Sequence, residues 1–335
     1  MGLAHDVSRM WGMAQLATPM ALRVAATLRL AERTADAPRT VADLASEAGV
    51  EAGALDPVLR HLAFRGVLRT DEHGAYSMTE LGATLRADHP GGLHALLDTG
   101  SAIGRGDLAF AHLLHSVRTG EPGYPLHHGR TFWADLADDA ELASSFYDQM
   151  SAQVAANGPA VAAGFGWGGL DHVVDVGGGD GSLLVALLTA FPDLRGTVVE
   201  AAGPAATARR TVTDAGLDGR AEVVVGDFFD ALPTGGDGYL LCQILHDWDD
   251  PEATEILRRC AEAAGTDGRV LVVERTGADG AALHAGMDLR MLVYFGGRER
   301  GEEQYAELGR AAGLRLVDVH DAAPLAVLEF APSSS

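Results

Sequence analysis

A run of apolar residues that ends in an acid and then in a cluster of glycines constrains this chain more than any other feature. Residues 172–176 read His-Val-Val-Asp-Val, and residues 177–181 include four glycines. Residues 183–188 are then uniformly apolar, as expected for a buried helix. A strand, a tight glycine turn and a helix in this order form the floor of a nucleotide-binding crevice. The sequence therefore predicts a crevice in which a ligand contacts the backbone directly, because glycine has no side chain to block its approach.

The spacing of these glycines separates the possible ligands. A dinucleotide fingerprint needs glycine at its first, third and sixth positions, and counted from Gly177 the sixth residue is Ser182. A phosphate-binding loop needs Gly-Lys-Ser or Gly-Lys-Thr, and the chain contains no lysine. The remaining pattern, Asp175-x-Gly177-x-Gly179-x-Gly181, resembles motif I of S-adenosylmethionine (SAM) methyltransferases, whose ligand has no phosphate. A glycine-rich turn without any ligand is the alternative.

Composition limits the partners of the chain. Its 335 residues are enough for two domains with full cores. The net charge is −22 and all 25 basic residues are arginine, which disfavours nucleic acid and anionic membranes as partners. The two cysteines, Cys242 and Cys260, suggest neither a disulfide framework nor a metal site. The start of the chain has no secretory pattern, and the longest uncharged stretch, residues 149–170, is interrupted by glycine and proline. We expect a soluble cytoplasmic protein without a metal.

The N-terminal half is expected to be mostly helical. Residues 5–33 place apolar side chains on one helical face, which needs a partner surface in the same chain or in a second subunit. Residues 40–86 have the pattern of a winged helix, with two helices followed by a short β-hairpin. Winged helices often bind DNA, yet this segment holds four arginines and seven acids, so its charge is −3. A dimerisation module therefore fits better than a transcription regulator.

The C-terminal half alternates short apolar runs with helical segments. This alternation predicts a doubly wound, largely parallel α/β sheet, and the last two runs are close enough for an antiparallel hairpin at its edge. We place the boundary between the helical domain, 1–165, and the cofactor domain, 166–335. The expected strands are 172–176, 196–200, 221–225, 238–245, 269–274, 314–319 and 325–330.

Polar or aromatic residues follow four of these runs, at the ends where ligands bind in such sheets. Glu200 ends the second run, nineteen residues after Gly181, a distance that suits an acid bound to ribose hydroxyls. The other three ends carry Asp227 with Phe228, His246, and Glu274. Each has a structural alternative, since an aspartate can cap a turn and a glutamate can end a strand in solvent. Asp249 or Asp250 is expected only to cap a helix that begins at Pro251.

Four strings together identify a resemblance that covers nearly the whole chain. They are VVDVGGGDGS, VVVGDFF, LHDWDD and GGRER, in this order. The C-terminal half is similar to the cofactor domain of SAM-dependent O-methyltransferases related to plant caffeic acid and flavonoid enzymes and to bacterial polyketide-tailoring enzymes. The N-terminal half resembles the dimerisation domain of that family. The resemblance implies a homodimeric enzyme that binds SAM, releases S-adenosylhomocysteine and needs no metal.

The resemblance also implies a role for particular residues. His246 matches the general base, and Glu274 and Glu299 match two acids that orient it. Cys242 stands where plant members have a lysine, so its contact with SAM would come from its backbone or through water. The remaining implied contacts with SAM are Gly177 and Gly179 under its methionine part, Glu200 on its ribose, and Asp227 with Phe228 on its adenine.

The acceptor is expected to be a hydroxyl, most simply a phenol, of a small aromatic natural product. Met150, Met287 and Met291 are candidates to line its pocket, together with Phe146 and Trp133, although each could equally be ordinary core. The same fold could instead bind SAM for decarboxylation or hydroxylation, since fold does not fix function. A nicotinamide enzyme is the remaining alternative, and Ser182 argues against it.

Overall fold

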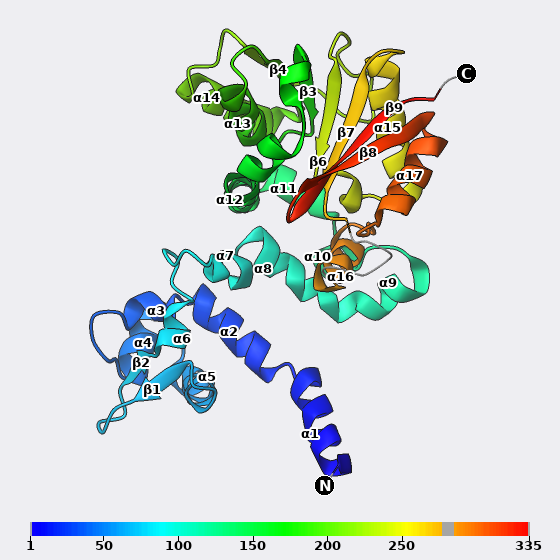
Figure 1. The fold of residues 1–335 in the computed structure, drawn as a ribbon. Coiled ribbons are helices and arrows are strands. Elements are labelled where there is room, and N and C mark those ends of the chain that lie inside the picture. The colour runs from blue at the N-terminus through cyan, green and yellow to red at the C-terminus, as the bar shows by residue number, and fades with distance from the viewer. Residues whose placement is uncertain (1, 277–284, 334–335) are drawn as a thin grey trace. The chain divides into compact units, whose positions relative to one another are not determined.

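The structure is a computed structural model that describes residues 2–276 and 285–333. The chain divides into two compact units, residues 1–108 and 109–335 (Figure 1). Sequence patterns place the boundary later, at 165/166. The difference arises because the helix at residues 140–164 packs on the sheet, through contacts between residues far apart in sequence that local patterns do not report. No helix among the described residues is both long and apolar enough to cross a membrane.

The first unit contains the expected winged helix. Thr40 and Asp43 form a capping box at the start of its first helix, and Gly49 ends that helix in the left-handed conformation. Strands β1 and β2 pair in antiparallel register as the wing. The elements of this unit are α1 (Gly2–Ala14), α2 (Ala17–Thr27), α3 (Leu30–Arg33), α4 (Val41–Ala48), α5 (Ala52–Phe64), β1 (Leu68–Thr70), β2 (Tyr76–Met78), α6 (Glu80–Ala83), α7 (Leu93–Leu97) and α8 (Ala102–Gly106).

The first helix of the chain leaves its apolar side chains in solvent. Met10, Trp11 and Met13 are between 63% and 68% exposed. The following helix α2 instead buries Ala21 and Ala25 in the core of the first unit. The apolar face predicted for residues 5–33 therefore finds a partner within the chain along α2 and at Leu30 and Ala31 of α3. The larger side chains on α1 present an uncovered apolar surface, which usually marks an interface.

The second unit begins with helices and continues into the sheet. It contains the short helix α10 (Tyr124–His128), which has proline at its second position. The other helices of this unit are α9 (Leu113–Thr119), α11 (Phe132–Asp138), α12 (Ala140–Gly164), α13 (Ser182–Ala190), α14 (Ala202–Asp214), α15 (Asp250–Ala264), α16 (Ala285–Tyr294) and α17 (Glu302–Ala311).

The sheet has seven strands in the order β5-β4-β3-β6-β7-β9-β8. The first five are parallel, and the hairpin β8–β9 adds to β7 in antiparallel register, which confirms the predicted doubly wound sheet and its edge hairpin. The run expected over 238–245 is shorter, because Gln243 has a positive φ and the strand ends at Cys242. The strands are β3 (His172–Val176), β4 (Arg195–Glu200), β5 (Ala221–Val225), β6 (Gly238–Cys242), β7 (Arg269–Glu274), β8 (Leu314–Ala322) and β9 (Leu325–Pro332).

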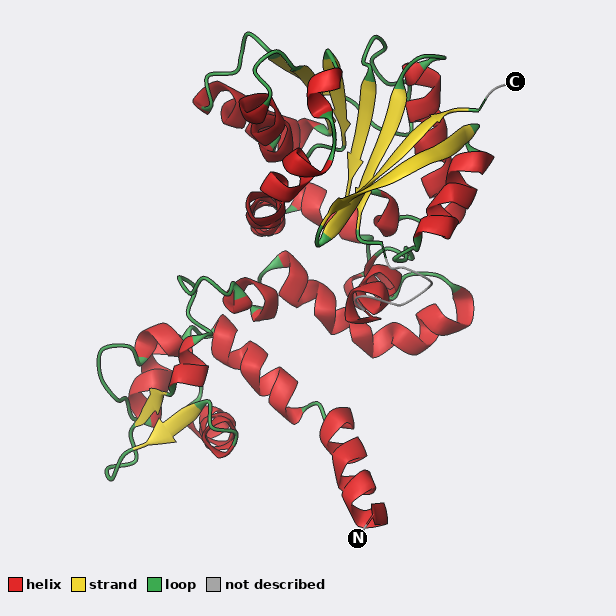
Figure 2. Ribbon diagram, in the orientation of Figure 1, coloured by secondary structure: helices red, strands yellow, loops and turns green. Residues whose placement is uncertain are grey.

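Helices cover both faces of this sheet (Figure 2). Alternate residues of β7 point to opposite faces, so Val270 and Val272 pack with α15 and α17, while Leu271 and Val273 pack with α12, α13 and α14. Helix α12 touches α13, β8 and β9. This packing is why the second unit begins before α12 and not after it.

Candidate active site

The glycine loop after β3 is closely packed on one side and open on the other. Gly177, Gly179 and Gly181 have φ of +73°, +58° and +78°. Residues other than glycine rarely adopt this region. A Cβ atom on Gly177 would stand 2.7 Å from the Ile244 side chain, whereas one on Gly179 would meet no atom within 4 Å. A ligand can therefore approach the backbone at Gly179.

Glu200 lies beside this opening at the end of β4. Its Oε2 accepts a hydrogen bond from the Gly179 amide at 2.9 Å, and its Oε1 accepts one from the Ala201 amide at 2.7 Å. Burial raises the pKa of Glu200, and these two amide hydrogen bonds oppose the rise. Each carboxylate oxygen can accept a second hydrogen bond, so Glu200 can still bind the hydroxyls of a ribose.

Asp175, the acid of the glycine motif, has an unsatisfied oxygen. The residue is 1% exposed, and its Oδ2 has no hydrogen-bond partner within the described chain. Burial first, and then the charges of Glu200 and Asp180, raise the pKa of Asp175 to about 7. A buried carboxyl without a donor is costly in a folded protein, so the site is incomplete without a polar ligand or water. The sequence highlighted Asp175 within its motif without assigning it a contact.

Aromatic rings stand next to the glycine loop. A Cβ atom on Gly177 would lie 3.5 Å from the ring of Phe228, the residue expected against adenine. Phe228, Phe229 and Trp248 form a group with ring centroids 4.9 to 5.7 Å apart. Asp227 accepts a hydrogen bond from the Phe229 amide at 2.9 Å, which is the turn-capping contact considered as its structural alternative. That contact uses Oδ1, so Oδ2 of Asp227 can still serve a ligand.

Cys242 ends β6 with its thiol between two carboxyl groups. Burial raises the pKa of this thiol well above its usual value, and the charges of Asp175 and Glu274 raise it further. The thiol therefore stays protonated and neutral. This neutral side chain occupies the position where the related plant enzymes carry a lysine, so the chain lacks that positive charge.

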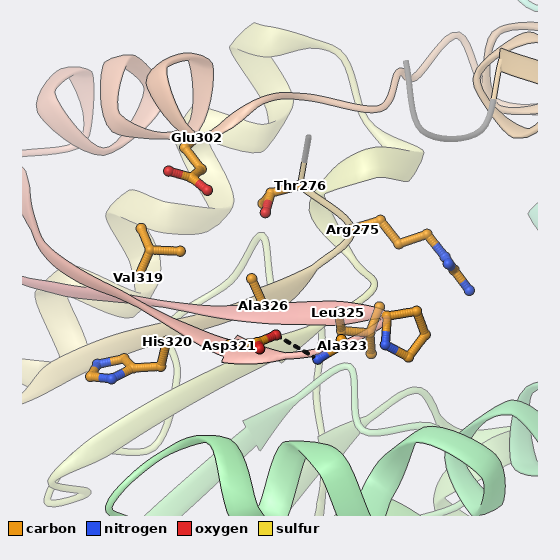
Figure 3. A pocket seen from close by; sticks show the side chains of 10 residues that line it. Arg275, Thr276, Glu302, Val319, His320, Asp321, Ala323, Leu325 and Ala326 are labelled. Carbon is orange, nitrogen blue, oxygen red and sulfur yellow. Dashed lines mark hydrogen bonds between the residues drawn. The ribbon is translucent and has the colours of Figure 1, made fainter. Parts of the chain in front are cut away.

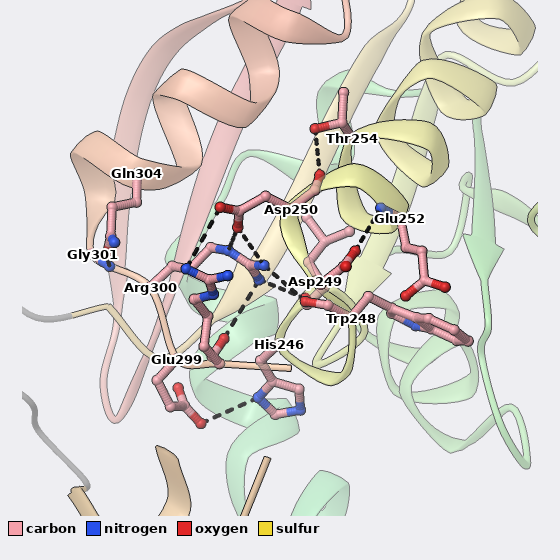
Figure 4. Close-up of polar contacts among 12 residues, drawn as sticks. His246, Trp248, Asp249, Asp250, Glu252, Thr254, Glu299, Arg300, Gly301 and Gln304 are labelled. Carbon is pink, nitrogen blue, oxygen red and sulfur yellow. Dashed lines mark hydrogen bonds and ion pairs between the residues drawn. The ribbon is translucent and has the colours of Figure 1, made fainter. Parts of the chain in front are cut away.

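Three carboxylates lie near His246, and Figure 4 shows one of them, Glu299, beside its ring. Its Nδ1 is 3.3 Å from Glu299 Oε1 and 3.4 Å from Glu274 Oε2, so the structure brings together the histidine and the two acids named from the sequence, and their roles stay a prediction. Its Nε2 is 3.5 Å from Oδ1 of Asp247, a neighbour to which the sequence gave no role. Nδ1 of the imidazole therefore faces two carboxylates, and Nε2 faces one.

The carboxylates decide the charge of His246. Burial lowers the pKa of its imidazole, but Glu274, Asp247 and Glu299 together outweigh burial and raise the pKa to about 10. Burial also raises the pKa of Asp247, to about 7, against the opposing effect of His246. The ligand-free imidazole therefore holds its proton more tightly than an ordinary histidine does.

Glu274 holds the backbone of the histidine segment as well as its ring. Its side chain is fully buried, and Oε1 accepts hydrogen bonds from the amides of Leu245 at 3.0 Å and of His246 at 3.4 Å. Its role in orienting the ring stays a prediction, and the two amide hydrogen bonds anchor the backbone in a way that no local sequence pattern indicates.

Arg300 joins the loop that carries Glu299 to the loop that carries His246 (Figure 4). The residue is 3% exposed, and its guanidinium donates to the carbonyl oxygens of Leu245 at 2.7 Å and of Trp248 at 2.8 Å. It also donates to Oδ1 of Asp250 through two nitrogens, at 2.8 and 3.0 Å. Asp249 caps α15 as expected. Arg300 lies in the GGRER string, which was the available signal for it, but its structural role was missed.

The candidates for the acceptor pocket belong to an aromatic cluster of the second unit. The ring of Trp133 stacks on Phe295 at 5.2 Å and meets the edge of Phe146 at 5.8 Å. Met291 is buried on α16, whereas Met287 on α16 and Met150 on α12 are half-buried. These methionines share helices with members of the cluster, and their contact with an acceptor stays a prediction.

A second hollow, of about 430 Å³, lies at the turn between β8 and β9 (Figure 3). It is lined by polar and apolar side chains, among them Arg275, Glu302 and Asp321. It contains none of the residues expected at the site, so we do not connect it with the chemistry at His246. Among the described residues, no group of three or more histidine, cysteine, aspartate or glutamate side chains could hold a metal ion.

The residues around the glycine loop fit SAM. Gly179 leaves backbone accessible, Asp175 has an oxygen without a donor, and Glu200 can accept from ribose hydroxyls. Together with the seven-stranded sheet that ends in an antiparallel hairpin, these residues define a SAM-dependent methyltransferase.

Comparison with known proteins identifies the family within the SAM-dependent methyltransferases. An O-methyltransferase domain model matches residues 110–315, and an O-methyltransferase dimerisation domain model matches residues 11–88. The chain belongs to this O-methyltransferase family and is a SAM-dependent enzyme of its natural-product branch.

Relatives from antibiotic producers are similar over nearly the full length. The 2,7-dihydroxy-5-methyl-1-naphthoate 7-O-methyltransferase of Streptomyces carzinostaticus is 52% identical, with 95% of this chain and 96% of that protein covered. Aclacinomycin 10-hydroxylase of Streptomyces purpurascens is 43% identical, with 90% and 82% covered. The solved structure of an O-methyltransferase from neocarzinostatin biosynthesis, in complex with SAM and 2-hydroxy-5-methyl naphthoic acid, has a TM-score of 0.92 and 51% identity. It covers 96% of this chain and 98% of that one.

Proposed function

We propose that this enzyme methylates a phenolic hydroxyl of a hydroxylated naphthoic acid, with His246 as the general base. The observation that carries the proposal is the 52% identity, over 95% of the chain, to an enzyme that methylates a dihydroxy-naphthoate. The intact cluster of His246, Glu274 and Glu299 supports a reaction that requires removal of a hydroxyl proton.

The cofactor would be held by the residues around the glycine loop. Glu200 would bind the ribose hydroxyls, Phe228 and Asp227 the adenine, and backbone at Gly177 and Gly179 the methionine part. The half-buried, neutral thiol of Cys242 would contact it without adding charge. When bound, SAM supplies a methyl group that its sulfonium has already activated, so no metal is required for transfer.

His246 would remove the proton from the acceptor. With Nδ1 facing Glu274 and Glu299, the neutral ring carries its hydrogen on Nδ1 and offers the lone pair of Nε2. The acceptor hydroxyl gives its proton to Nε2 as its oxygen gains the methyl group, and the two glutamates stabilise the resulting imidazolium. A phenol has an ordinary pKa of about 10 and is mostly protonated at neutral pH, so its methylation benefits from a base. His246 can act as that base only in its neutral form, and the neutral fraction grows as the pH rises toward its raised pKa.

The aromatic cluster suits a flat bicyclic acceptor. Phe146 and Trp133 offer ring faces and edges, and Met150, Met287 and Met291 offer pliant thioether contacts. We infer that these side chains line the acceptor pocket.

An acceptor panel tests the proposed function. The enzyme, SAM and a set of naphthoic acids with and without hydroxyl groups should give products heavier by one CH₂ group, detected by mass spectrometry, only where a hydroxyl is present. Simple monocyclic phenols should react more slowly, since they bury less aromatic area. A product heavier by one oxygen atom would instead indicate hydroxylation, the reaction named for the 43% identical relative. A product lighter by carbon dioxide would indicate decarboxylation. Either product would overturn the proposal.

Replacing Glu299 with glutamine should move the acidic limb of the pH profile to lower pH. The base must be neutral to accept a proton, so kcat/KM for the acceptor rises as pH passes upward through the pKa of His246. Glu299 raises that pKa, and removing its charge lets the pKa fall. The measurement is kcat/KM between pH 6 and 10 at saturating SAM. An unmoved limb would show that another group controls the profile.

We propose that two copies of the chain form a homodimer through the first unit. The dimerisation-domain match over residues 11–88 and the exposed apolar side chains of α1 support this. Analytical ultracentrifugation should find twice the 34.9 kDa chain mass. Replacing the exposed Trp11 with aspartate should shift the equilibrium toward the monomer, and a wild-type monomer would reject the proposal.

A further inference from the structure

The glycine loop depends on contacts from outside itself to keep one conformation. Three of its residues lie in the left-handed region, and glycine loses more freedom on ordering than any other residue. Within the loop, the Gly181 amide donates to the Gly178 carbonyl at 2.9 Å. From outside it, Glu200 holds the Gly179 amide on the side of β4.

A second outside contact comes from α12. The Oγ of Ser151 lies 2.5 Å from Oδ2 of Asp180, the residue between Gly179 and Gly181. The same hydroxyl is 2.8 Å from the carbonyl oxygen of Tyr147, one turn earlier on the helix. A serine hydroxyl has a single hydrogen to donate, and the charged, closer carboxylate is the stronger acceptor. Ser151 therefore bonds chiefly to Asp180.

Asp180 links Ser151 to the glycine loop and to the helix that follows the loop, because it bonds to Ser182 as well. Its Oδ1 accepts from the Ser182 amide at 3.0 Å, and its Oδ2 accepts from the Ser182 hydroxyl at 2.7 Å. These two bonds alone would be an ordinary aspartate turn ahead of α13, whose N-cap residue is Gly181. The bond from Ser151 is different, because it ties the Asp180 carboxylate to a separate helix that lies against α13.

The packing of α12 makes it a firm support. A Cβ atom on Gly158 of this helix would come within 4.0 Å of Leu183 and Ala186 on α13, so the two helices approach closely. Ser151 thus fixes Asp180 from one side of the loop, while Glu200 holds Gly179 from the other.

We propose that Ser151 is a positioning residue for the cofactor, which acts through Asp180 to hold the glycine loop in the conformation that binds SAM. This inference rests on the proposed function, because it assigns a new residue to the same site. Ser151 need not touch the cofactor itself. Its loss should weaken binding of SAM and leave the transfer step of the bound complex unchanged.

The first experiment separates affinity from catalysis. In Ser151→Ala, the Kd of S-adenosylhomocysteine measured by calorimetry and the KM of SAM should both rise about tenfold, since a hydrogen bond to a charged group is lost. kcat at saturating SAM and the acceptor KM should stay within about twofold. Alanine favours helix, so the variant should fold. Ser151→Thr, which keeps the hydroxyl, should retain affinity, and Ser144→Ala, at an exposed position of the same helix, should match wild type.

A double-mutant cycle tests the route through Asp180. Asp180→Ala should raise the Kd of S-adenosylhomocysteine further than Ser151→Ala, because the two bonds from Ser182 to the Asp180 carboxylate are also lost. Adding Ser151→Ala to Asp180→Ala should then change the Kd by less than about twofold. Additive effects, or a fall in kcat with KM unchanged, would overturn the proposal. Calorimetry with S-adenosylhomocysteine needs no acceptor, so its outcome is independent of whether the naphthoic acid assignment holds.

Discussion

Replacing His246 with alanine should lower kcat by about 10²- to 10⁴-fold while the Kd of SAM changes little. The imidazole is held at Nδ1 by Glu274 and Glu299, which leaves Nε2 as the proton acceptor, and alanine offers no substitute. Single-turnover rates with radiolabelled SAM measure the loss, and calorimetry measures cofactor affinity. Because Glu274 bonds to the amides of residues 245 and 246, the loop should keep its shape in the variant.

The acceptor supplies a control for this prediction. The loss should shrink as the acceptor phenol becomes more acidic, because an ionised phenol needs no base. His172 provides a matched control. It is half-buried, its Nε2 is 2.9 Å from the Thr197 hydroxyl, and it is not part of the carboxylate cluster. Replacing His172 with alanine should leave kcat nearly unchanged. Full activity of His246→Ala with a weakly acidic naphthol would refute the base assignment.

Replacing Arg300 with methionine should destabilise the protein by about 3 kcal/mol. Methionine fills much of the space, but the carbonyl oxygens of Leu245 and Trp248 lose their donors in a buried setting. Each such charge-assisted hydrogen bond contributes about 1.5–3 kcal/mol. Urea unfolding at fixed protein concentration, followed by circular dichroism, measures the change.

Arg298 provides the comparison for Arg300. Its side chain is 48% exposed and its guanidinium is 3.6 Å from Asp250. Replacing it with methionine should therefore cost less than about 1 kcal/mol, because an exposed ion pair contributes little. Equal losses of stability in the two variants would show that the buried contacts of Arg300 add no more stability than an exposed ion pair.

Arg300→Met should also lower kcat, since Glu299 is its neighbour in the chain and both loops at His246 depend on its contacts.

Much of the cofactor domain was predictable because its signals are local. Apolar runs of strand length, each followed by a helical pattern, predict the parallel sheet, and two adjoining runs predict the edge hairpin. The end of β6 was placed three residues too late, because Leu240 to Leu245 is almost continuously apolar and nothing in that run reveals the positive φ of Gln243. The boundary between units was missed because the packing of α12 on the sheet is a long-range contact.

The positions of candidate site residues were predictable where those residues lie at the ends of strands. They were less predictable where burial alone separates a site residue from its neighbours in the sequence. Glu200, Asp227, His246 and Glu274 follow strands of one parallel sheet, and that position alone brings them to one edge. Asp247, whose carboxylate faces Nε2 of His246, could not be separated from the other acids in LHDWDD. Three-dimensional packing distinguishes them, since Asp249 caps a helix while Asp247 is enclosed with the histidine.

The double role of Glu274 has an evolutionary consequence. The carboxylate fixes the peptide backbone at residues 245 and 246 independently of which side chain position 246 carries. A lineage could therefore exchange the imidazole for another group without rebuilding the crevice or losing the cofactor. Descendants of one ancestral scaffold would then be free to diverge in reaction type while remaining alike in backbone, and overall similarity would be a weaker guide to chemistry than the identity of that one side chain.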